Sequence, residues 1–364
     1  MKSVTITIFT LLFLSACVQV EQPIEKIKIG ILEPLTGTTA FIGERVKNSI
    51  ELAHGELSSE DQALIELIYE DDGCNGKQAV TAVQKLTQTD MVDYIIGPTC
   101  NNAAIPTIEI LRESGIIYIS TGVISEKFAA AGEHHFTLQP RIKDLMYLLA
   151  DYAYAKEARN MSILYLNDEF GKESVLHFEK RFTELGGNII LKENFAPSDN
   201  DFRTQISKLK EQPVDGIFMM SYGSWLVNQL KQMDELGLKT PIYGPVPAQD
   251  PKLIEAAGKL AEGIIYPYPD EKTKIQSQIE FAEKYRTKYG IDTEIYAEIG
   301  YDTFNILMKV VKKCGKDKQC AKQQLSKLQG YKGAGGILST DQDGVGKRSI
   351  VIKRINNGKF IYVE

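Results

Sequence analysis

A repeated alternation of short apolar runs with longer amphipathic stretches constrains the fold more than any other feature of this sequence. From Lys26 onward, the apolar runs have the length of strands and the amphipathic stretches the length of helices, which is typical of βαβ units with a parallel sheet. The pattern runs through one block, from 27 to 120, and restarts in a second block, from 162 to 243. Two such blocks predict an α/β protein with two similar, Rossmann-like lobes.

The two blocks supply the expected strands and helices in turn. Strands are predicted at 27–32, 64–69, 94–96 and 116–120, and then at 162–166, 189–193, 216–220 and 242–243. Helices are predicted at 40–57, 76–88 and 103–114, and then at 172–185, 202–211 and 224–236. Each block therefore has enough strands to form a sheet of its own.

The rhythm changes after a short apolar run at 263–266. Beyond it, the pattern predicts three helices at 274–289, 297–313 and 318–328, a glycine-rich segment at 330–336, and a hairpin with strands at 349–355 and 360–363. We expect the helices to return to the first lobe and the hairpin to the second, across a three-segment hinge near 139–141, 266–269 and 330–333. Lobe one then comprises 27–140 and 268–330, and lobe two comprises 141–267 and 331–364.

The first residues have the features of an export signal. Lys2 is followed by an apolar run from 4 to 14, which is typical of a signal-peptide core and is shorter than the roughly 20 residues of a membrane-spanning helix. The run ends in Leu14-Ser15-Ala16-Cys17, which resembles the lipobox of bacterial lipoproteins. We therefore expect a signal peptide at 1–16, a lipid on Cys17 and a tether at 17–26. An ordinary signal-peptidase site with an unrelated cysteine is the alternative.

Four further cysteines, Cys74, Cys100, Cys314 and Cys320, remain in the exported part. An even number in an exported chain favours disulfides, and three pairings are possible. Proximity in sequence favours Cys314 with Cys320, which leaves Cys74 with Cys100. A metal site is the competing interpretation, but no histidine lies near either pair, so no metal is expected.

Ligands of open parallel sheets bind beyond the carboxyl ends of the strands, so the loops after the strands are the candidate site. In lobe one these loops are 33–37, 97–102 and 120–125. The loop 97–102 carries short hydroxyl and amide side chains and leads into a predicted helix, whose free N–H groups would favour an anion such as a carboxylate. Helix capping is the alternative role for Thr99, Asn101 or Asn102.

Lobe two supplies the loops 167–171, 221–225 and 244–250. Phe170, Tyr222 and Trp225 in these loops could form the flat apolar walls that small-molecule sites usually have. For Trp225, a place in the core is an equally good interpretation.

Together these segments resemble the leucine/isoleucine/valine-type substrate-binding proteins of ABC importers. The resemblance covers nearly all of the exported part, and its motifs are 27–37, Asp71-Asp72-Gly73-Cys74 with Lys77-Gln78-Ala79, Ile96-Gly97-Pro98 with Cys100, Ile119-Ser120, and Tyr301-Asp302. It implies a type I periplasmic-binding fold, a Cys74–Cys100 bridge, and the three hinge crossings. It also implies a monomer that captures a small molecule between two closing lobes and delivers it to a permease.

The resemblance also implies roles for individual residues. In amino-acid-binding members, a serine after the second cysteine and a threonine after the fourth strand hold the ligand carboxylate. Here these positions are Asn101, which can still donate a hydrogen bond, and Ile124, which cannot unless the neighbouring Ser125 takes its place. The acidic residue that meets the ligand ammonium is replaced by Val246, so either Asp250 substitutes for it or the ligand carries no ammonium.

The predicted site is more apolar than the corresponding sites of its relatives. Phe41 and Phe170 stand at two aromatic positions where a tyrosine is usual, and Tyr222 stands at a third. The complete set of predicted ligand-binding residues is Phe41, Asn101, Asn102, Val123, Ser125, Phe170, Tyr222 and Asp250.

No motif supports an enzyme. Gly30, Gly37 and Gly43 are spaced too widely for a dinucleotide-binding fingerprint, and the sequence contains no phosphate-binding P-loop. The segment 341–346 imitates the start of a calcium loop but has Ile352 at the twelfth position, where a glutamate is required. We therefore expect neither catalysis nor a cofactor.

The predicted partners are a small-molecule ligand, an ABC permease and a membrane reached through the lipid, outside the cytoplasm at the cell surface or in the periplasm. The formal charge of -6 and the absence of a basic cluster argue against nucleic acid. The alternative is a sensor of the same fold that reports the ligand to a signalling partner, because both functions need hinge closure driven by the ligand. The lipobox favours import.

Overall fold

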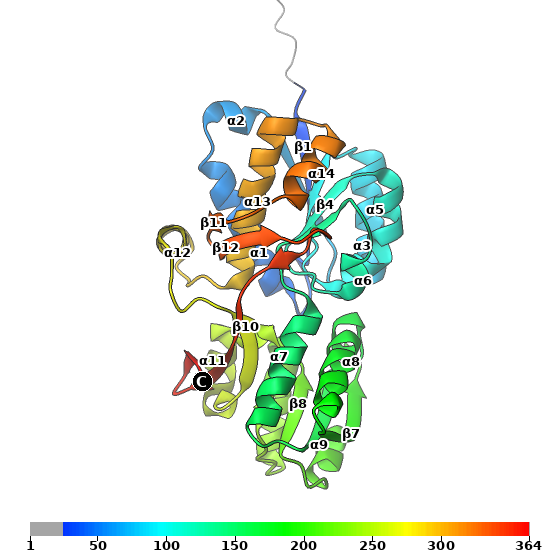
Figure 1. Ribbon diagram of the computed structural model, residues 1–364, viewed down its shortest axis with the longest axis vertical. Helices are drawn as coiled ribbons and strands as arrows, with labels where there is room; N and C mark the ends of the chain where they lie inside the picture. The colour runs from blue at the N-terminus through cyan, green and yellow to red at the C-terminus, as the bar shows by residue number, and fades with distance from the viewer. Residues whose placement is uncertain (1–24, 364) are drawn as a thin grey trace, which may run out of the picture.

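The computed structural model describes residues 25–363, which form two α/β lobes stacked along the long axis of the molecule (Figure 1). The predicted signal peptide, Cys17 and the tether up to residue 24 lie outside the described residues. No helix within the described range is long and apolar enough to cross a membrane.

The first lobe is built on a five-stranded, wholly parallel sheet of order β2-β1-β3-β4-β5. Its strands are β1 (Ile27–Glu33), β2 (Ile65–Asp71), β3 (Tyr94–Ile96), β4 (Ile117–Ser120) and β5 (His135–Thr137). Its helices are α1 (Ala40–Gly55), α2 (Ser59–Ala63), α3 (Gly76–Gln84), α4 (Asn101–Ala104), α5 (Ile108–Ser114) and α6 (Glu126–Ala129). Strand order reverses beside β1, so the loops after β1 and β3 face a switch point, where such sheets bind ligands.

The second lobe is built on a seven-stranded sheet of order β15-β14-β10-β9-β8-β6-β7. Its parallel strands are β6 (Asn160–Leu166), β7 (Asn188–Phe195), β8 (Gly216–Met220), β9 (Ile242–Tyr243) and β10 (Ile265–Pro269). The closing hairpin, β14 (Ile350–Asn356) and β15 (Lys359–Tyr362), adds to this sheet in antiparallel fashion. The helices are α7 (Ile142–Ala155), α8 (Glu169–Glu184), α9 (Arg203–Lys210), α10 (Gly223–Glu235) and α11 (Pro251–Ala257).

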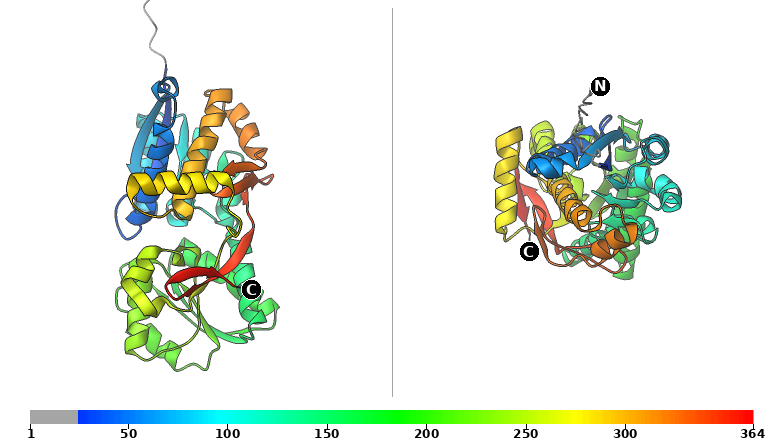
Figure 2. Two further views of the ribbon diagram at one scale, coloured as in Figure 1. Left: turned by 90° about the vertical axis from the view of Figure 1, so that its left-hand side faces the viewer. Right: turned by 90° about the horizontal axis from the view of Figure 1, so that it is seen from above.

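The three late helices return to the first lobe, as Figures 1 and 2 show. They are α12 (Gln276–Tyr289), α13 (Ile295–Cys314) and α14 (Lys318–Ser326). The long helix α13 packs on α1 so closely that a Cβ on Gly300 would lie 2.4 Å from the Oγ of Ser49. Glycine at this position therefore permits the contact that fixes the returning segment to the lobe.

A small sheet lies beside the first lobe and corrects the predicted place of the third crossing. It consists of β11 (Tyr331–Gly333), β12 (Gly336–Thr340) and β13 (Gly346–Lys347). The N–H groups of Ala334 and Gly335 donate to the buried carboxylate of Asp302 in α13, and Val345 forms a bridge with Thr137 of β5. The glycine-rich segment therefore stays with lobe one, and the chain crosses after β13 instead of at 330–333.

Several elements were not predicted, and one of the predicted helices is divided. The elements absent from the sequence-based expectation include α2, β5, α6, α7, α11 and β11 to β13. The single helix expected at 103–114 is instead α4, a 3-10 turn at Ile105–Thr107 and α5. Pro106 lies in that turn, and a proline there has no N–H to continue a regular helix.

The four described cysteines form two disulfides, Cys74–Cys100 and Cys314–Cys320. Both pairings that sequence proximity and the family resemblance favoured are confirmed. The first bridge ties the end of β2 to the loop after β3, and so it supports the loop that carries Asn101.

Candidate ligand-binding cleft

A cavity with about 680 Å³ of empty space, part of it open to solvent, lies between the lobes at the switch point. Its walls come from both lobes and the crossings: Ile42, Cys74, Thr99, Cys100, Asn101, Asn102, Gly122, Ile124, Gln139, Pro140, Leu145, Phe170, Tyr222, Val246, Pro247, Pro269, Ile295 and Tyr296.

The lining is uncharged, since none of the described residues in it is an aspartate, glutamate, lysine, arginine or histidine. Burial raises the pKa of both the Tyr222 and the Tyr296 hydroxyl, so both stay neutral. The polar side chains that remain are hydroxyls and amides. Such a wall suits a ligand that is mainly apolar and is recognised by a few hydrogen bonds.

Asn101 is the predicted site residue whose geometry points most clearly to a ligand. Its side chain is 4 % exposed, and its Oδ1 accepts a hydrogen bond from the N–H of Ile124 at 3.2 Å. That bond fixes the amide orientation, so Nδ2 is the donor that remains, and it has no partner among the described residues. A buried donor without an acceptor costs about 1 to 3 kcal/mol, which an accepting group on a ligand would relieve.

Asn102 joins the lobes. Its Nδ2 donates to the Oδ2 of Asp168 at 2.8 Å, and its Oδ1 accepts from the N–H of Glu169 at 2.9 Å. Asp168 also caps α8 by accepting from the N–H of Gly171. Burial raises the pKa of Asp168, and the hydrogen bond from Asn102 acts in the opposite direction. Both polar ends of Asn102 are thus used between the lobes, and the arrangement is the closed one.

Phe170 and Tyr222, two of the predicted residues, form an aromatic wall of the cavity. Their ring centroids lie 6.0 Å apart in an edge-to-face contact. Tyr222 packs in turn on Trp225, which contacts Phe195. Trp225 belongs to the core of the lobe and stands behind the wall instead of in the cavity.

Four predicted residues lie away from the cavity lining. Val123 is fully buried in the core of lobe one, and Ser125 caps α6 by accepting from the N–H of Lys127. Asp250 caps α11 and pairs with Arg45 at 3.3 Å. Phe41 lies under the guanidinium of Arg45. Ser125 therefore serves as a helix cap in this structure, and Asp250 has a structural cation as its partner.

Three cavity residues from the first turns of the long helices α1 and α13 were not predicted from the sequence. Ile42 comes from the first turn of α1, while Ile295 and Tyr296 come from the first turn of α13. None of them directly follows a strand of its own lobe's sheet, whereas the predicted site was limited to the loops that follow strands. Ile124 and Val246, the two positions at which the chain departs from the amino-acid-binding motif, both line the cavity.

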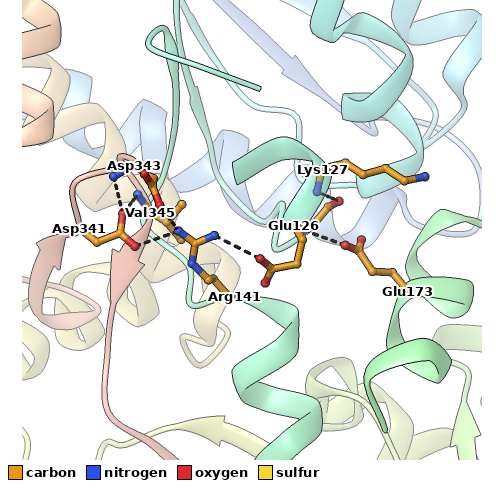
Figure 3. A network of polar contacts seen from close by, with 8 residues as sticks. Glu126, Lys127, Arg141, Glu173, Asp341, Asp343 and Val345 are labelled. Atoms are coloured by element: carbon orange, nitrogen blue, oxygen red, sulfur yellow. Dashed lines mark hydrogen bonds and ion pairs between the residues drawn. The ribbon is translucent and has the colours of Figure 1, made fainter. Parts of the chain in front are cut away.

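A polar network spans the hinge (Figure 3). Arg141, at the first crossing, donates to Glu126 at 3.2 Å, to Asp341 at 3.0 Å and to Asp343 at 2.8 Å. The N–H of Glu126 donates to the carboxylate of Glu173 in α8 at 2.7 Å. The network connects α6, the β12–β13 loop and lobe two, and so it also holds the closed arrangement.

The fold and the cleft together define a two-lobed solute-binding protein of the type I periplasmic-binding fold. The profile of the periplasmic binding protein family matches residues 26–359, and the chain belongs to this family. Membership confirms the fold that the resemblance implied. Its relatives are solute-binding proteins, which accords with the prediction that the chain is not an enzyme.

The relatives include proteins of the leucine/isoleucine/valine type, which confirms the resemblance. A Leu/Ile/Val-binding protein homolog of Brucella abortus is 24 % identical over 348 residues, 93 % of each chain. The Leu/Ile/Val-binding protein of Escherichia coli is 22 % identical over 269 residues, 72 % of this chain and 73 % of its own.

Two solved structures illustrate the fold. A leucine-binding protein of Thermotoga maritima has a TM-score of 0.87 at 22 % identity, covering 93 % of this chain and 98 % of its own. A solute-binding protein of R. palustris in complex with benzoate has a TM-score of 0.85 at 20 % identity, covering 93 % of this chain and 95 % of its own.

Proposed function

We propose that this protein captures a small, mainly apolar carboxylate between its lobes and delivers it to an ABC importer. The observation that carries the proposal is the composition of the cavity wall. It offers one buried, unpartnered amide donor, the Nδ2 of Asn101, within a lining that carries no charged side chain among the described residues. A carboxylate oxygen is a natural acceptor for that donor, and the rings of Phe170 and Tyr222 suit an apolar or aromatic body.

An α-amino acid fits this wall less well than a carboxylate without an ammonium group. The ammonium would have no carboxylate partner in the described lining, because Asp250 is held by Arg45. A ligand carboxylate, in contrast, meets the Nδ2 of Asn101 as a hydrogen-bond donor, whereas the ammonium would be buried without a partner of opposite charge. Relatives bind both classes, leucine in one case and benzoate in another, so the family alone leaves the choice open.

The protein acts outside the cytoplasm, as its family implies, and we propose that it does so as a monomer held by a lipid on Cys17. The apolar run at 4–14 and the lipobox-like Leu14-Ser15-Ala16-Cys17 support this part of the proposal. Mass spectrometry of the membrane-extracted protein tests it. A diacylated or triacylated Cys17 is the expected result, and an unmodified amino terminus at that residue contradicts it.

A thermal-shift screen tests the ligand class. Amino acids, amides, short-chain carboxylates and aromatic acids should be compared, because a ligand held only by the closed protein stabilises it by about 2.7 kcal/mol at a hundredfold excess over Kd. We expect carboxylates without an ammonium to raise the melting temperature most. A larger shift with leucine contradicts the proposed class, and no shift with any compound contradicts solute binding.

Two asparagine-to-aspartate variants, one in the cavity and one as a matched control, test the role of Asn101. Asn101→Asp keeps the shape but puts a carboxylate where the ligand carboxylate is expected, so the shift should be lost. Asn200→Asp, on an exposed loop of lobe two, makes the same chemical change far from the cavity and should keep the shift. Equal behaviour of the two variants removes Asn101 from the site.

A further inference from the structure

A closed triangle of hydrogen-bonding groups stands directly behind the cleft. Glu33, the last residue of β1, has no exposed surface, and its Oε2 lies 2.6 Å from the Oγ1 of Thr99. Its Oε1 lies 2.5 Å from the Oγ1 of Thr121, and the two threonine oxygens are 2.8 Å apart. The three residues come from the ends of the adjacent strands β1, β3 and β4, and Thr99 lines the cavity.

The number of hydrogens decides the protonation state of this triangle. Three oxygen–oxygen contacts at these distances require three hydrogens. The hydroxyls of Thr99 and Thr121 supply two. If Glu33 is ionised, both hydroxyls donate to it, and the 2.8 Å contact between them sets lone pair against lone pair. If Glu33 carries a proton, each of the three groups donates once and accepts once.

The surroundings of Glu33 favour the neutral acid. No described ion pair includes Glu33, and burial and then the charge of Asp72 raise its pKa well above the usual range, while hydrogen bonds from Thr121 and Thr99 act against them. The titratable groups that face it are Asp72, after β2, and Tyr118 of β4. Burial raises the pKa of Asp72 to about 7, and Tyr118 also stays neutral because burial raises its pKa.

We propose that Glu33 is a positioning residue of the cleft: it retains a proton and, through the ring with Thr99 and Thr121, presents the Thr99 hydroxyl to the ligand as a hydrogen-bond acceptor. In such a ring the Thr99 hydrogen is committed to a neighbour, and one lone pair is left for the cavity. Thr99 then selects for a donor on the ligand, and the carboxylate is left to Asn101. The ligand part of this inference rests on the proposed function.

Infrared difference spectroscopy tests the proton without any ligand. Wild type minus Glu33→Gln near neutral pH should show the carbonyl band of an un-ionised carboxylic acid. Glu66→Gln, at an exposed position of β2, should instead remove the bands of an ionised carboxylate. If the Glu33 difference also shows ionised carboxylate bands, the proposal is overturned, whatever the cleft binds.

Binding tests the positioning role, with benzoate and 4-hydroxybenzoate as the probes. Glu33→Leu breaks the ring and should weaken binding of 4-hydroxybenzoate, whose phenol can donate to Thr99, by about tenfold, the equivalent of one hydrogen bond. Benzoate has no donor, so its affinity should fall less than that of 4-hydroxybenzoate. Glu33→Gln supplies a donor and an acceptor and should restore most of that loss. It should also remove the wild-type loss of affinity as the pH rises through the Glu33 pKa. Equal affinity of Glu33→Leu and wild type, or a wild-type pH profile retained in Glu33→Gln, contradicts the positioning role.

Discussion

Replacing Arg45 by methionine tests the electrostatics of the closed arrangement. Arg45 lies on α1 of lobe one and pairs with Asp250 of lobe two at 3.3 Å and with Glu294 at 3.5 Å. The side chains of these three residues are at most 10 % exposed. Removing the cation therefore leaves two buried carboxylates without a counter-charge, which costs about 3 to 5 kcal/mol in comparable buried pairs.

The expected loss depends on pH in a definite direction. Burial already raises the pKa of Glu294, and Arg45 is the main influence that lowers it, so the variant raises it further. A carboxyl whose pKa is higher in the folded than in the unfolded state binds more protons when folded. Its contribution to the free energy of unfolding therefore falls as the pH rises above the unfolded pKa. Arg45→Met should lose more stability near pH 8 than near pH 5.

Urea unfolding followed by circular dichroism measures this loss, with Lys47→Met as the control. Lys47 lies two residues away on α1 and pairs with Glu51 at 3.8 Å, but both side chains are more than 40 % exposed. An exposed pair of this kind is worth at most about 1 kcal/mol. If Arg45→Met destabilises the protein no more than Lys47→Met, or shows the opposite pH dependence, the reasoning is wrong.

Single contacts give three further predictions. Asn102→Ala removes two interlobe hydrogen bonds, one of them to a carboxylate. The variant should bind the ligand about 10- to 100-fold more weakly by calorimetry and should be more open in small-angle scattering. Unchanged affinity and scattering contradict the role of Asn102 in closure. Replacing Cys74 and Cys100 together by serine should lower the free energy of unfolding by about 3 to 4 kcal/mol, because their bridge spans 26 positions. Removing the six-position Cys314–Cys320 bridge in the same way should lower it by about 2 kcal/mol. The reverse order contradicts the chain-entropy argument. Glu33→Gln should gain stability relative to the wild type as the pH rises above the unfolded glutamate pKa, by up to about 1.4 kcal/mol per pH unit, because the wild type must take up a proton to fold and the variant does not. Parallel pH profiles contradict a raised Glu33 pKa.

The alternation of apolar runs predicted the strands well where a strand is short and fully buried. Tyr94–Ile96, Gly216–Met220 and Ile242–Tyr243 have the predicted boundaries. Strand β5 was missed because it has three residues and begins with His135, so no apolar run marks it. Helix α7 did carry a signal, since its buried residues recur at helical spacing from Ile142 to Ala153.

The third hinge crossing shows what local pattern lacks. Glycines at 330–336 are compatible with a flexible crossing or with a tight turn, and the sequence does not distinguish the two. The choice is made by Asp302, a buried carboxylate some 30 positions earlier, which accepts the N–H groups of Ala334 and Gly335. Such a contact depends on tertiary packing and leaves no periodic trace.

The site was predictable to the extent that strand ends define it. Asn101, Asn102, Phe170 and Tyr222 lie where the loops after the strands were expected to converge. Within a loop, however, the side that faces the cavity depends on individual backbone angles. For that reason Ile124 lines the cavity while its neighbours Val123 and Ser125 turn into the core and onto a helix end.

A crystal structure of the protein with the carboxylate that gives the largest thermal shift tests the central claim most directly. We expect a ligand enclosed between the lobes, with a carboxylate oxygen about 2.7 to 3.2 Å from the Nδ2 of Asn101 and the Asn102–Asp168 hydrogen bond intact. A ligand bound outside the cleft, or one whose ammonium displaces Arg45 from Asp250, contradicts it.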